Sequence, residues 1–297
     1  MADVSESPHI VRAAKARPSG VHTPETRVPS STRWDHDAEI EAIRALWERQ
    51  KREDSVSGVH GANLDYAAAH IEHDVPLRRR LRVLDQIAPY LHGRVFEWGC
   101  QHGIDSCIYR LRFGNKLELH GADLYAPGAF HVFHQFSRLQ YKQLEHPVFM
   151  PYPDGFFDVI TSNGVLEHVA DDATSLYEVF RILRPGGTFL ITCLPNRFSY
   201  TEAIQRLLKH NAHDRLYTIR STTAILQAAG FEVHDAGHSF IVPTMLYGFP
   251  RWAQRAFNRL DRPLHHLNAR LERQWPLKLL ASNLWLLARK PTHSPSS

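Results

Sequence analysis

Residues 95–103 read VFEWGCQHG, and this stretch decides the fold class of the chain. A short strand-like run ends at one glycine, and a second glycine precedes a helix-like segment. Gly99 would let the backbone approach a ligand closely, and Gly103 would let the helix open tightly against the strand. Glu97, at the end of the strand, would offer a carboxylate to a cationic or hydroxylated ligand. The pattern predicts a ligand-binding turn between a strand and a helix.

The same turn excludes two common nucleotide-binding motifs. A dinucleotide fingerprint needs G-x-G-x-x-G, but Gln101 stands at the second glycine position and Ile104 at the third. No lysine follows at the Walker position, so a P-loop is excluded as well. A glycine turn without a ligand in an arbitrary α/β protein is the alternative reading of this segment.

Strand-like and helix-like segments alternate along the chain on both sides of this turn. The alternation predicts an α/β fold with a largely parallel sheet covered by helices on both faces. Residues 124–138 show no clean period. The expected strands are residues 94–98, 117–123, 139–144, 157–162, 188–194, 231–238 and 283–288. The expected helices are residues 38–51, two stretches within 63–91 broken near Pro76, 103–113, 172–183 (stopped by RPGG at 184–187) and 221–229 (capped by Gly230).

A second signal is GADL, residues 121–124, at the end of the second expected strand. Asp123 follows the glycine turn by about 20 residues, the spacing at which a carboxylate can accept hydrogen bonds from both hydroxyls of a ribose. Taken alone, Asp123 is better explained as a helix cap or a surface acid. Together with the glycine turn, it favours a ligand that carries a ribose.

The longest signal comprises PYPDGFFDVITSNGVLEHV at residues 151–169 and RILRPGGTFLI at residues 181–191. With the two earlier segments, it resembles class I S-adenosyl-L-methionine-dependent methyltransferases, in particular the branch that methylates small molecules, quinones, lipids and sugars. The resemblance covers roughly residues 80–238 and the last strand. It implies a Rossmann-like seven-stranded methyltransferase sheet and S-adenosyl-L-methionine as the cofactor.

The resemblance also implies which residues bind that cofactor. The acid and glycines of the turn, with its intervening residues, hold the methionine part, and Asp123 with its neighbour holds the ribose. Asn163 lies beside the cofactor, and the loop near Leu144 and Glu145 flanks the adenine. Two positions depart from the family pattern: Gln101 replaces a small residue, and His146 stands where many relatives have an Asp. The predicted cofactor-binding residues are Glu97, Gly99, Cys100, Gln101, Gly103, Asp123, Leu124, Glu145 and Asn163.

The pair Glu167–His168 follows the fourth expected strand. His168 is a candidate general base, because the pKa of imidazole lies near neutral pH. The alternative, which we favour from the sequence, is that the pair opens the next helix and packs there. Some relatives bind a divalent ion through a Glu three residues before such a pair, but this chain has Gly164 there. We therefore predict no metal site.

Composition bounds the remaining organisation. The 297 residues carry a formal net charge of +4, too small to predict a nucleic-acid partner. Three cysteines without a C-x-x-C motif, and no apolar leader, favour a cytoplasmic protein. The expected divisions are a disordered tail (1–33), a helical cap (34–92), the cofactor-binding core (93–239), a helical insertion (240–282) and the last strand with a tail (283–297).

The insertion interleaves apolar and basic residues between positions 251 and 278. The simpler interpretation is a solvated helical pair packed on the core. The alternatives are a lid, or a basic amphipathic surface that contacts a membrane peripherally or binds an anionic lipid-linked glycan. Residues 196–220 are expected to form another wall of the acceptor site. Its candidate contacts are Tyr200, His210, His213 and Tyr217.

These signals predict methyl transfer, to oxygen by preference, on a small molecule, glycan or lipid. After the fourth strand the chain has Ser-Asn-Gly-Val at residues 162–165 in place of an Asn/Asp-Pro-Pro-Tyr motif, which disfavours amino-methylation of bases or amides. Methylation of a macromolecule remains one alternative. The other is a non-catalytic methyltransferase-like module that acts as a binding partner.

Overall fold

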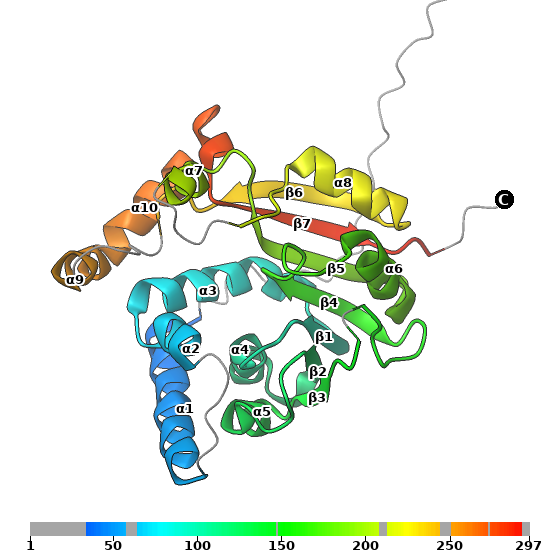
Figure 1. Cartoon of the computed structure of the whole chain (residues 1–297), viewed down its shortest axis with the longest axis horizontal. Helices are drawn as coiled ribbons and strands as arrows, with labels where there is room; N and C mark the ends of the chain where they lie inside the picture. The colour runs from blue at the N-terminus through cyan, green and yellow to red at the C-terminus, as the bar shows by residue number, and fades with distance from the viewer. Residues whose placement is uncertain are drawn as a thin grey trace, which may run out of the picture. The chain divides into compact units, whose positions relative to one another are not determined.

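A seven-stranded mixed sheet forms the centre of the computed structural model (Figure 1). The strand order is β3-β2-β1-β4-β5-β7-β6, and only β7 runs antiparallel to its neighbours. The strands are β1 Arg94–Trp98, β2 Glu118–Asp123, β3 Gln140–Gln143, β4 Phe157–Asn163, β5 Leu183–Pro195, β6 Glu232–Ser239 and β7 Asn283–Arg289. The structure describes residues 34–57, 64–146, 148–207, 213–243, 251–272 and 274–292. Because six strands point the same way, their carboxyl ends meet along one edge of the sheet, hereafter the carboxyl edge.

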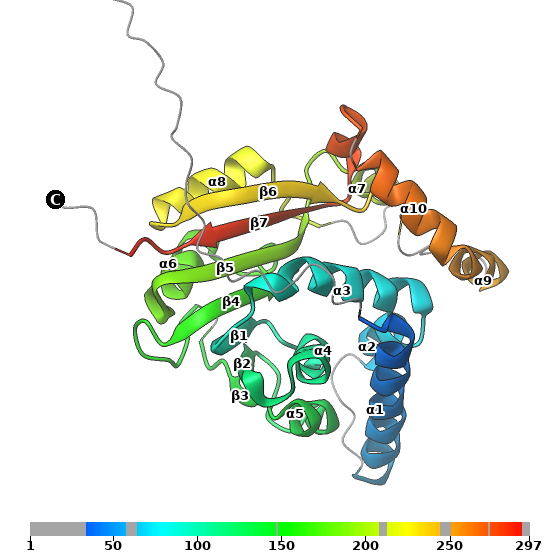
Figure 2. The same cartoon turned by 180° about the vertical axis from the view of Figure 1, so that it is seen from behind.

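Helices cover both faces of the sheet, as predicted (Figures 1 and 2). Successive strand residues point to opposite faces, so Val95 and Leu287 join a core with α1–α5, whereas Phe96 and Leu286 join a second core with α6 and α8. The helices are α1 His36–Ser57, α2 Leu64–Ile71, α3 Asp74–Ile87, α4 Ile104–Phe113, α5 His131–Ser137, α6 Asp172–Ile182, α7 Tyr200–Leu207, α8 Ile219–Ala228, α9 Arg251–Arg259 and α10 Asp261–Leu271. The short 3-10 turns are η1 Ala88–Tyr90, η2 Gly114–Lys116 and η3 Leu277–Leu280.

Three local predictions need correction. The break between α2 and α3 falls at residues 72–73, and Pro76 lies inside the first turn of α3, where a backbone N–H has no helical partner to lose. Residues 131–137, which show no period, form α5. The RPGG segment does stop α6, but β5 already begins at Leu183, since Leu183 pairs with Phe157 before the register shifts.

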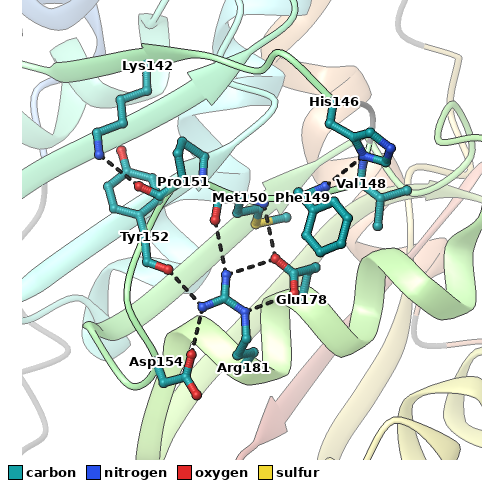
Figure 3. Close-up of polar contacts among 10 residues, drawn as sticks. All are labelled: Lys142, His146, Val148, Phe149, Met150, Pro151, Tyr152, Asp154, Glu178 and Arg181. Atoms are coloured by element: carbon teal, nitrogen blue, oxygen red, sulfur yellow. Dashed lines mark hydrogen bonds and ion pairs between the residues drawn. The ribbon is translucent and has the colours of Figure 1, made fainter.

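The loop before β4 is held by a single arginine of α6 (Figure 3). Arg181 donates hydrogen bonds to the carbonyl oxygens of Met150 (3.0 Å) and Tyr152 (2.8 Å), and to the carboxylates of Asp154 (2.8 Å) and Glu178 (2.9 Å). The backbone N–H of Met150 also donates to Glu178. These contacts fix residues 150–154 against α6 and thereby set the entry of the chain into β4.

Residues Arg33–Ser297 group as one compact unit, so the boundaries between cap, core and insertion stay predictions. The tail predicted for residues 1–33 lies outside the described residues. Residues 251–272 form the helices α9 and α10, and η3 leads into β7. Among the described helices, none is both long and apolar enough to cross a bilayer.

Candidate active site

The glycine turn after β1 curls at the carboxyl edge of the sheet. Gly99, Gln101 and Gly103 all have positive φ angles, of 69°, 43° and 72°. A Cβ atom at Gly99 would lie 2.6 Å from the side chain of Val165, so only glycine fits there. Gln101 accepts the left-handed conformation that glycine usually takes, and the backbone N–H of Gln101 donates to Asp123 at 2.9 Å. The departure at Gln101 therefore keeps the shape of the turn.

The side chain of Cys100 packs against β2. It is buried there, and a Cβ atom at Gly121 would lie 2.8 Å from its Sγ. Burial raises the pKa of this thiol well above its ordinary value, so the thiol stays protonated at neutral pH. Only the backbone of Cys100 is available to a ligand.

Two buried carboxylates link the turn to the end of β4. Glu97 accepts hydrogen bonds from the backbone N–H (3.1 Å) and the hydroxyl of Ser106 in the first turn of α4. Asp105 accepts from Arg80 (3.0 Å) and from the side-chain amide of Asn163 (3.0 Å). Burial and the nearby charge of Asp105 raise the pKa of Glu97. The network fixes Asn163 beside the glycine turn.

Asp123 lies at the carboxyl end of β2. Its two carboxylate oxygens accept from the backbone N–H groups of Gln101 (2.9 Å) and Leu124 (2.7 Å). Burial nevertheless raises its pKa. The backbone N–H of Tyr125 donates to this carboxylate as well. Because an ionised carboxylate has about four acceptor sites, Asp123 keeps the capacity for a further hydrogen bond from a ligand.

The ends of β2 and β3 lie side by side at the carboxyl edge. The backbone N–H of Leu144 donates to the carbonyl of Asp123 at 2.8 Å, and the side chain of Gln143 donates to the carbonyl of Leu124 at 3.2 Å. Leu124 and Glu145 are both exposed there. Nδ1 of His146 accepts from the backbone N–H groups of Val148 (3.2 Å) and Phe149 (3.3 Å), so this imidazole caps its own loop (Figure 3).

Glu167 and His168 lie in a turn, so the expectation that they open a helix is wrong. The N-cap of α6 is Asp171, whose side chain accepts from the backbone N–H of Thr174. The side chain of His168 is 66% exposed, whereas that of Glu167 is buried and its Oε2 has no hydrogen-bond partner. Burial raises the pKa of Glu167 to about 7.

His213 joins this turn from the segment between α7 and α8. Its Nδ1 lies 2.7 Å from Oε1 of Glu202 on α7, and its backbone N–H donates to the other oxygen of Glu202 at 3.1 Å. The Glu202 hydrogen bond raises the pKa of His213. The rings of His168 and His213 are 5.8 Å apart between centroids. The structure thus assembles an acid–base cluster from Glu167, His168, His213 and Glu202.

Three members of this cluster could also hold a cation. One ligand atom from each of Glu167, His168 and His213 lies within 4.8 Å of the others. Gly164 removes one ligand that some relatives use, but His213 brings another ligand atom from a distant segment. The absence of a metal site therefore stays a prediction.

The other candidate contacts of residues 196–220 have different roles. The hydroxyl of Tyr200 donates to the carbonyl of Ile241 at 2.7 Å, and the hydroxyl of the buried Tyr217 donates to the carbonyl of Leu166 at 3.1 Å. Both tyrosine hydroxyls therefore bind backbone carbonyls of neighbouring segments. His210 lies outside the described residues. Glu202 was missed by the sequence analysis, because nothing in its spacing signals that it pairs with a residue of another segment.

Comparison with known proteins decides the family. The family model described as a methyltransferase domain matches residues 68–236, which is more than half of the chain. The chain belongs to this methyltransferase family. The predicted fold class is confirmed, and the family makes S-adenosyl-L-methionine the cofactor, as predicted.

Relatives of the methyltransferase agree with this assignment. It is 32% identical over 165 residues to a probable S-adenosylmethionine-dependent methyltransferase of Mycolicibacterium smegmatis, covering 55% of this chain and 62% of the relative. It is 32% identical over 176 residues to a ubiquinone biosynthesis O-methyltransferase of Pseudomonas aeruginosa, covering 55% of this chain and 74% of the relative. The alignment thus spans less than two thirds of the Mycolicibacterium protein.

A solved structure shares the fold of the methyltransferase. Phosphoethanolamine N-methyltransferase 2 of Haemonchus contortus, in complex with S-adenosyl-L-methionine, superposes with a TM-score of 0.50 at 18% identity. The superposition covers 72% of this chain and 52% of the other. At this identity the likeness concerns the fold alone.

Proposed function

We propose that this methyltransferase transfers a methyl group from S-adenosyl-L-methionine to a hydroxyl oxygen of a small acceptor. When bound, this cofactor supplies a methyl carbon that its sulfonium already activates. The protein must therefore position the acceptor oxygen and remove its proton. The observation that carries the proposal is that an acid–base cluster lies directly beyond β4, next to the glycine turn.

The residues of the donor side fit the cofactor. The remaining acceptor capacity of Asp123 suits a ribose hydroxyl. The raised pKa of Glu97 reflects a buried carboxylate without enough positive charge, which a cationic amino group near the turn would supply. The backbone of residues 99–103 and the amide of Asn163 complete the proposed cradle, with Leu124 and Glu145 at its adenine end.

We assign proton removal to His213. If Nδ1 carries the proton donated to Glu202, then Nε2 is left with a lone pair, which is the form a general base needs. Glu202 orients the ring and favours the imidazolium that forms. His168, the base expected from the sequence, is more exposed and has no comparable partner, so it becomes the second candidate.

Oxygen is the proposed acceptor atom because the Pseudomonas relative is named for O-methylation and the chain lacks an Asn/Asp-Pro-Pro-Tyr motif. A small molecule, glycan or lipid remains the acceptor class, with no nucleic acid. A cytoplasmic location, with peripheral membrane contact through residues 251–278, is also a proposal. The two alternatives are methylation of a macromolecule and a non-catalytic partner role.

Calorimetric titration of S-adenosyl-L-methionine tests the donor site first. The wild type should bind in the micromolar range, on the order of −8 kcal/mol. Asp123→Ala should weaken binding by about 30-fold or more, because the ribose loses a charged acceptor. Asp235→Ala, which removes an exposed carboxylate on β6, is the matched control and should bind like the wild type. If the folded wild type binds no cofactor, the enzymatic proposal fails and the partner-module alternative replaces it.

A further inference from the structure

The helices beside the acceptor side carry large apolar side chains in contact with solvent. Leu207, Trp252 and Trp275 are 82%, 73% and 76% exposed. We call this set of side chains the apolar–basic face. Its apolar members are Phe198, Ile204, Leu207, Trp252, Leu260, Leu267, Trp275, Leu277, Leu279 and Leu280. A helical pair that only covered the core would bury most such groups, so their number on these segments indicates a binding surface.

Basic side chains lie on the same segments as these apolar groups. Arg197, Arg206, Arg259 and Arg270 are all exposed on the same segments. Among the described side chains of residues 196–207 and 252–280, the only acids are Glu202 and Glu272. Glu202 is bound to His213, and Glu272 accepts from the backbone N–H of Phe240 and from the amide of Asn268. The face therefore presents positive charge next to apolar surface.

Hydrogen bonds tie this face to the carboxyl edge. The hydroxyl of Thr201 at the start of α7 bonds that of Ser282, the residue before β7, at 3.0 Å. Asn196, after β5, donates its amide to the carbonyl of Leu279 in η3 at 2.8 Å. On α10, Asn268 accepts from the backbone N–H of Val242 at 2.9 Å. The segments α7, α10 and η3 thus share one rim of the sheet, the rim at which β4 ends, and α9 packs against α10 beyond it (Figures 1 and 2).

The helix α7 connects the face to the chemistry. Its residue Glu202 is buried and bonds His213, while Ile204, Arg206 and Leu207 on the same helix are exposed. A surface that bound α7 from outside would lie one helix diameter, about 10 Å, from the proposed base. That distance suits an acceptor whose polar head reaches the cluster while its apolar part stays in the surface.

We propose that the apolar–basic face binds an anionic lipid bilayer and that the acceptor is an amphiphile, taken from that bilayer by its hydroxyl-bearing head. The inference rests on the proposed methyl transfer and narrows its acceptor to the lipid class. Exposed tryptophans favour the bilayer interface, where their amphipathic rings sit at the headgroup level. The negative potential of anionic lipids attracts the arginines on the same segments. Each arginine should raise the partitioning of the protein from water to the bilayer by about fivefold.

Co-sedimentation with vesicles tests the proposal on the full chain. The wild type should bind vesicles of 70% phosphatidylcholine and 30% phosphatidylglycerol, bind pure phosphatidylcholine at least about tenfold more weakly, and lose binding as salt rises. The double variant Trp252→Ser/Trp275→Ser should weaken binding to both vesicles. Arg259→Glu/Arg270→Glu should remove the preference for the anionic lipid. Leu111→Ser on α4 and Arg220→Glu on α8, which change exposed side chains elsewhere, are the matched controls and should bind like the wild type.

Two results would overturn the proposal. One is a wild type that does not sediment with anionic vesicles, and the other is binding that the controls weaken as much as the face variants do. A face that instead joins two copies of the chain would give a dimer in sedimentation velocity, which the Trp252→Ser/Trp275→Ser variant would dissociate. Titration of S-adenosyl-L-methionine into the same preparations separates the membrane inference from the proposed methyl transfer. If vesicle binding fails while S-adenosyl-L-methionine still binds, only the membrane inference falls.

Discussion

Two polar clusters of the methyltransferase are built from similar residues but differ in how completely they are satisfied. Around Arg181, every carboxylate and carbonyl named in the cluster accepts a hydrogen bond, and the pKa of Glu178 is lowered by its arginine partner (Figure 3). Around His213, Glu167 is buried with Oε2 unpartnered, and burial raises its pKa to about 7. The carboxylates of the first cluster are satisfied and stabilise a loop, whereas a buried carboxylate of the second retains unmet hydrogen-bonding capacity.

This difference indicates where the protein gives up stability for function. A buried carboxylate without a partner costs free energy, and such groups gather at sites that bind or react. If the comparison is right, variants in the Arg181 cluster should lower stability and leave the chemistry. Variants in the His213 cluster should change the chemistry or the way in which stability depends on pH.

The largest effect should come from His213→Ala. Loss of a general base lowers rates by about 10²- to 10⁴-fold, so kcat should fall by that factor while the affinity for S-adenosyl-L-methionine stays within about twofold. Transfer of labelled methyl to an acceptor found by screening measures the rate, and calorimetry measures the affinity. His234→Ala, on the exposed part of β6, is the control. A His213→Ala enzyme that keeps its kcat would return the role of base to His168.

Arg181→Ala should have the next largest effect, and it should act on stability. The variant removes the charged donor of Glu178, which keeps only the backbone N–H of Met150, and the donor of two loop carbonyls. This loss should cost about 3 kcal/mol of unfolding free energy. Urea unfolding measures this change. Arg49→Ala removes an exposed pair with Glu53 on α1 and should cost under about 0.5 kcal/mol. If both variants lose the same free energy of unfolding, the Arg181 cluster stabilises the protein no more than an ordinary surface ion pair does.

Glu167→Gln should stabilise the protein, which is unusual for a buried substitution. Because the pKa of Glu167 is raised in the folded state, the wild type is at full stability below about pH 4.5 and loses stability as the pH rises to about 7. A neutral glutamine avoids that loss, so the variant should gain about 2 kcal/mol at pH 8 and almost nothing at pH 4. Glu145→Gln, at an exposed carboxylate, should show no such pH dependence. A Glu167→Gln variant less stable than the wild type at pH 8 would contradict the assignment of an unmet carboxylate.

Local sequence patterns place the residues of the proposed donor half together, but not those of the acceptor half, and the reason is physical. Gly99 and Asp123 belong to one strand–helix–strand unit, β1-α4-β2, so their spacing predicts that they meet at the carboxyl edge. Glu202 and His213 meet Glu167 only because β4 and β5 end at the same rim, and no local period encodes that. The misplaced helix start at Glu167 has the same origin, since Asp171 gives an equally good cap a few residues later.

The finest test of the comparison is the pH dependence of Glu202→Gln. Glu202 raises the pKa of His213, so removing its charge should lower that pKa towards the ordinary value of imidazole. A general base must be neutral, so the rise of kcat with pH should move to lower pH in the variant, with a smaller plateau because the imidazolium loses its partner.

The same substitution should also change how the free energy of unfolding depends on pH. The Glu202–His213 pair stabilises the fold below the unfolded pKa of histidine, about 6.5, and this stabilisation is lost as the pH rises through the raised pKa. Glu202→Gln should therefore destabilise the protein more at pH 5.5 than at pH 9. Glu232→Gln, which alters the exposed pair with His234 on β6, should change neither profile. An activity profile of Glu202→Gln that overlays that of the wild type would show that His213 does not titrate in the reaction, and the two clusters would then differ only in their packing.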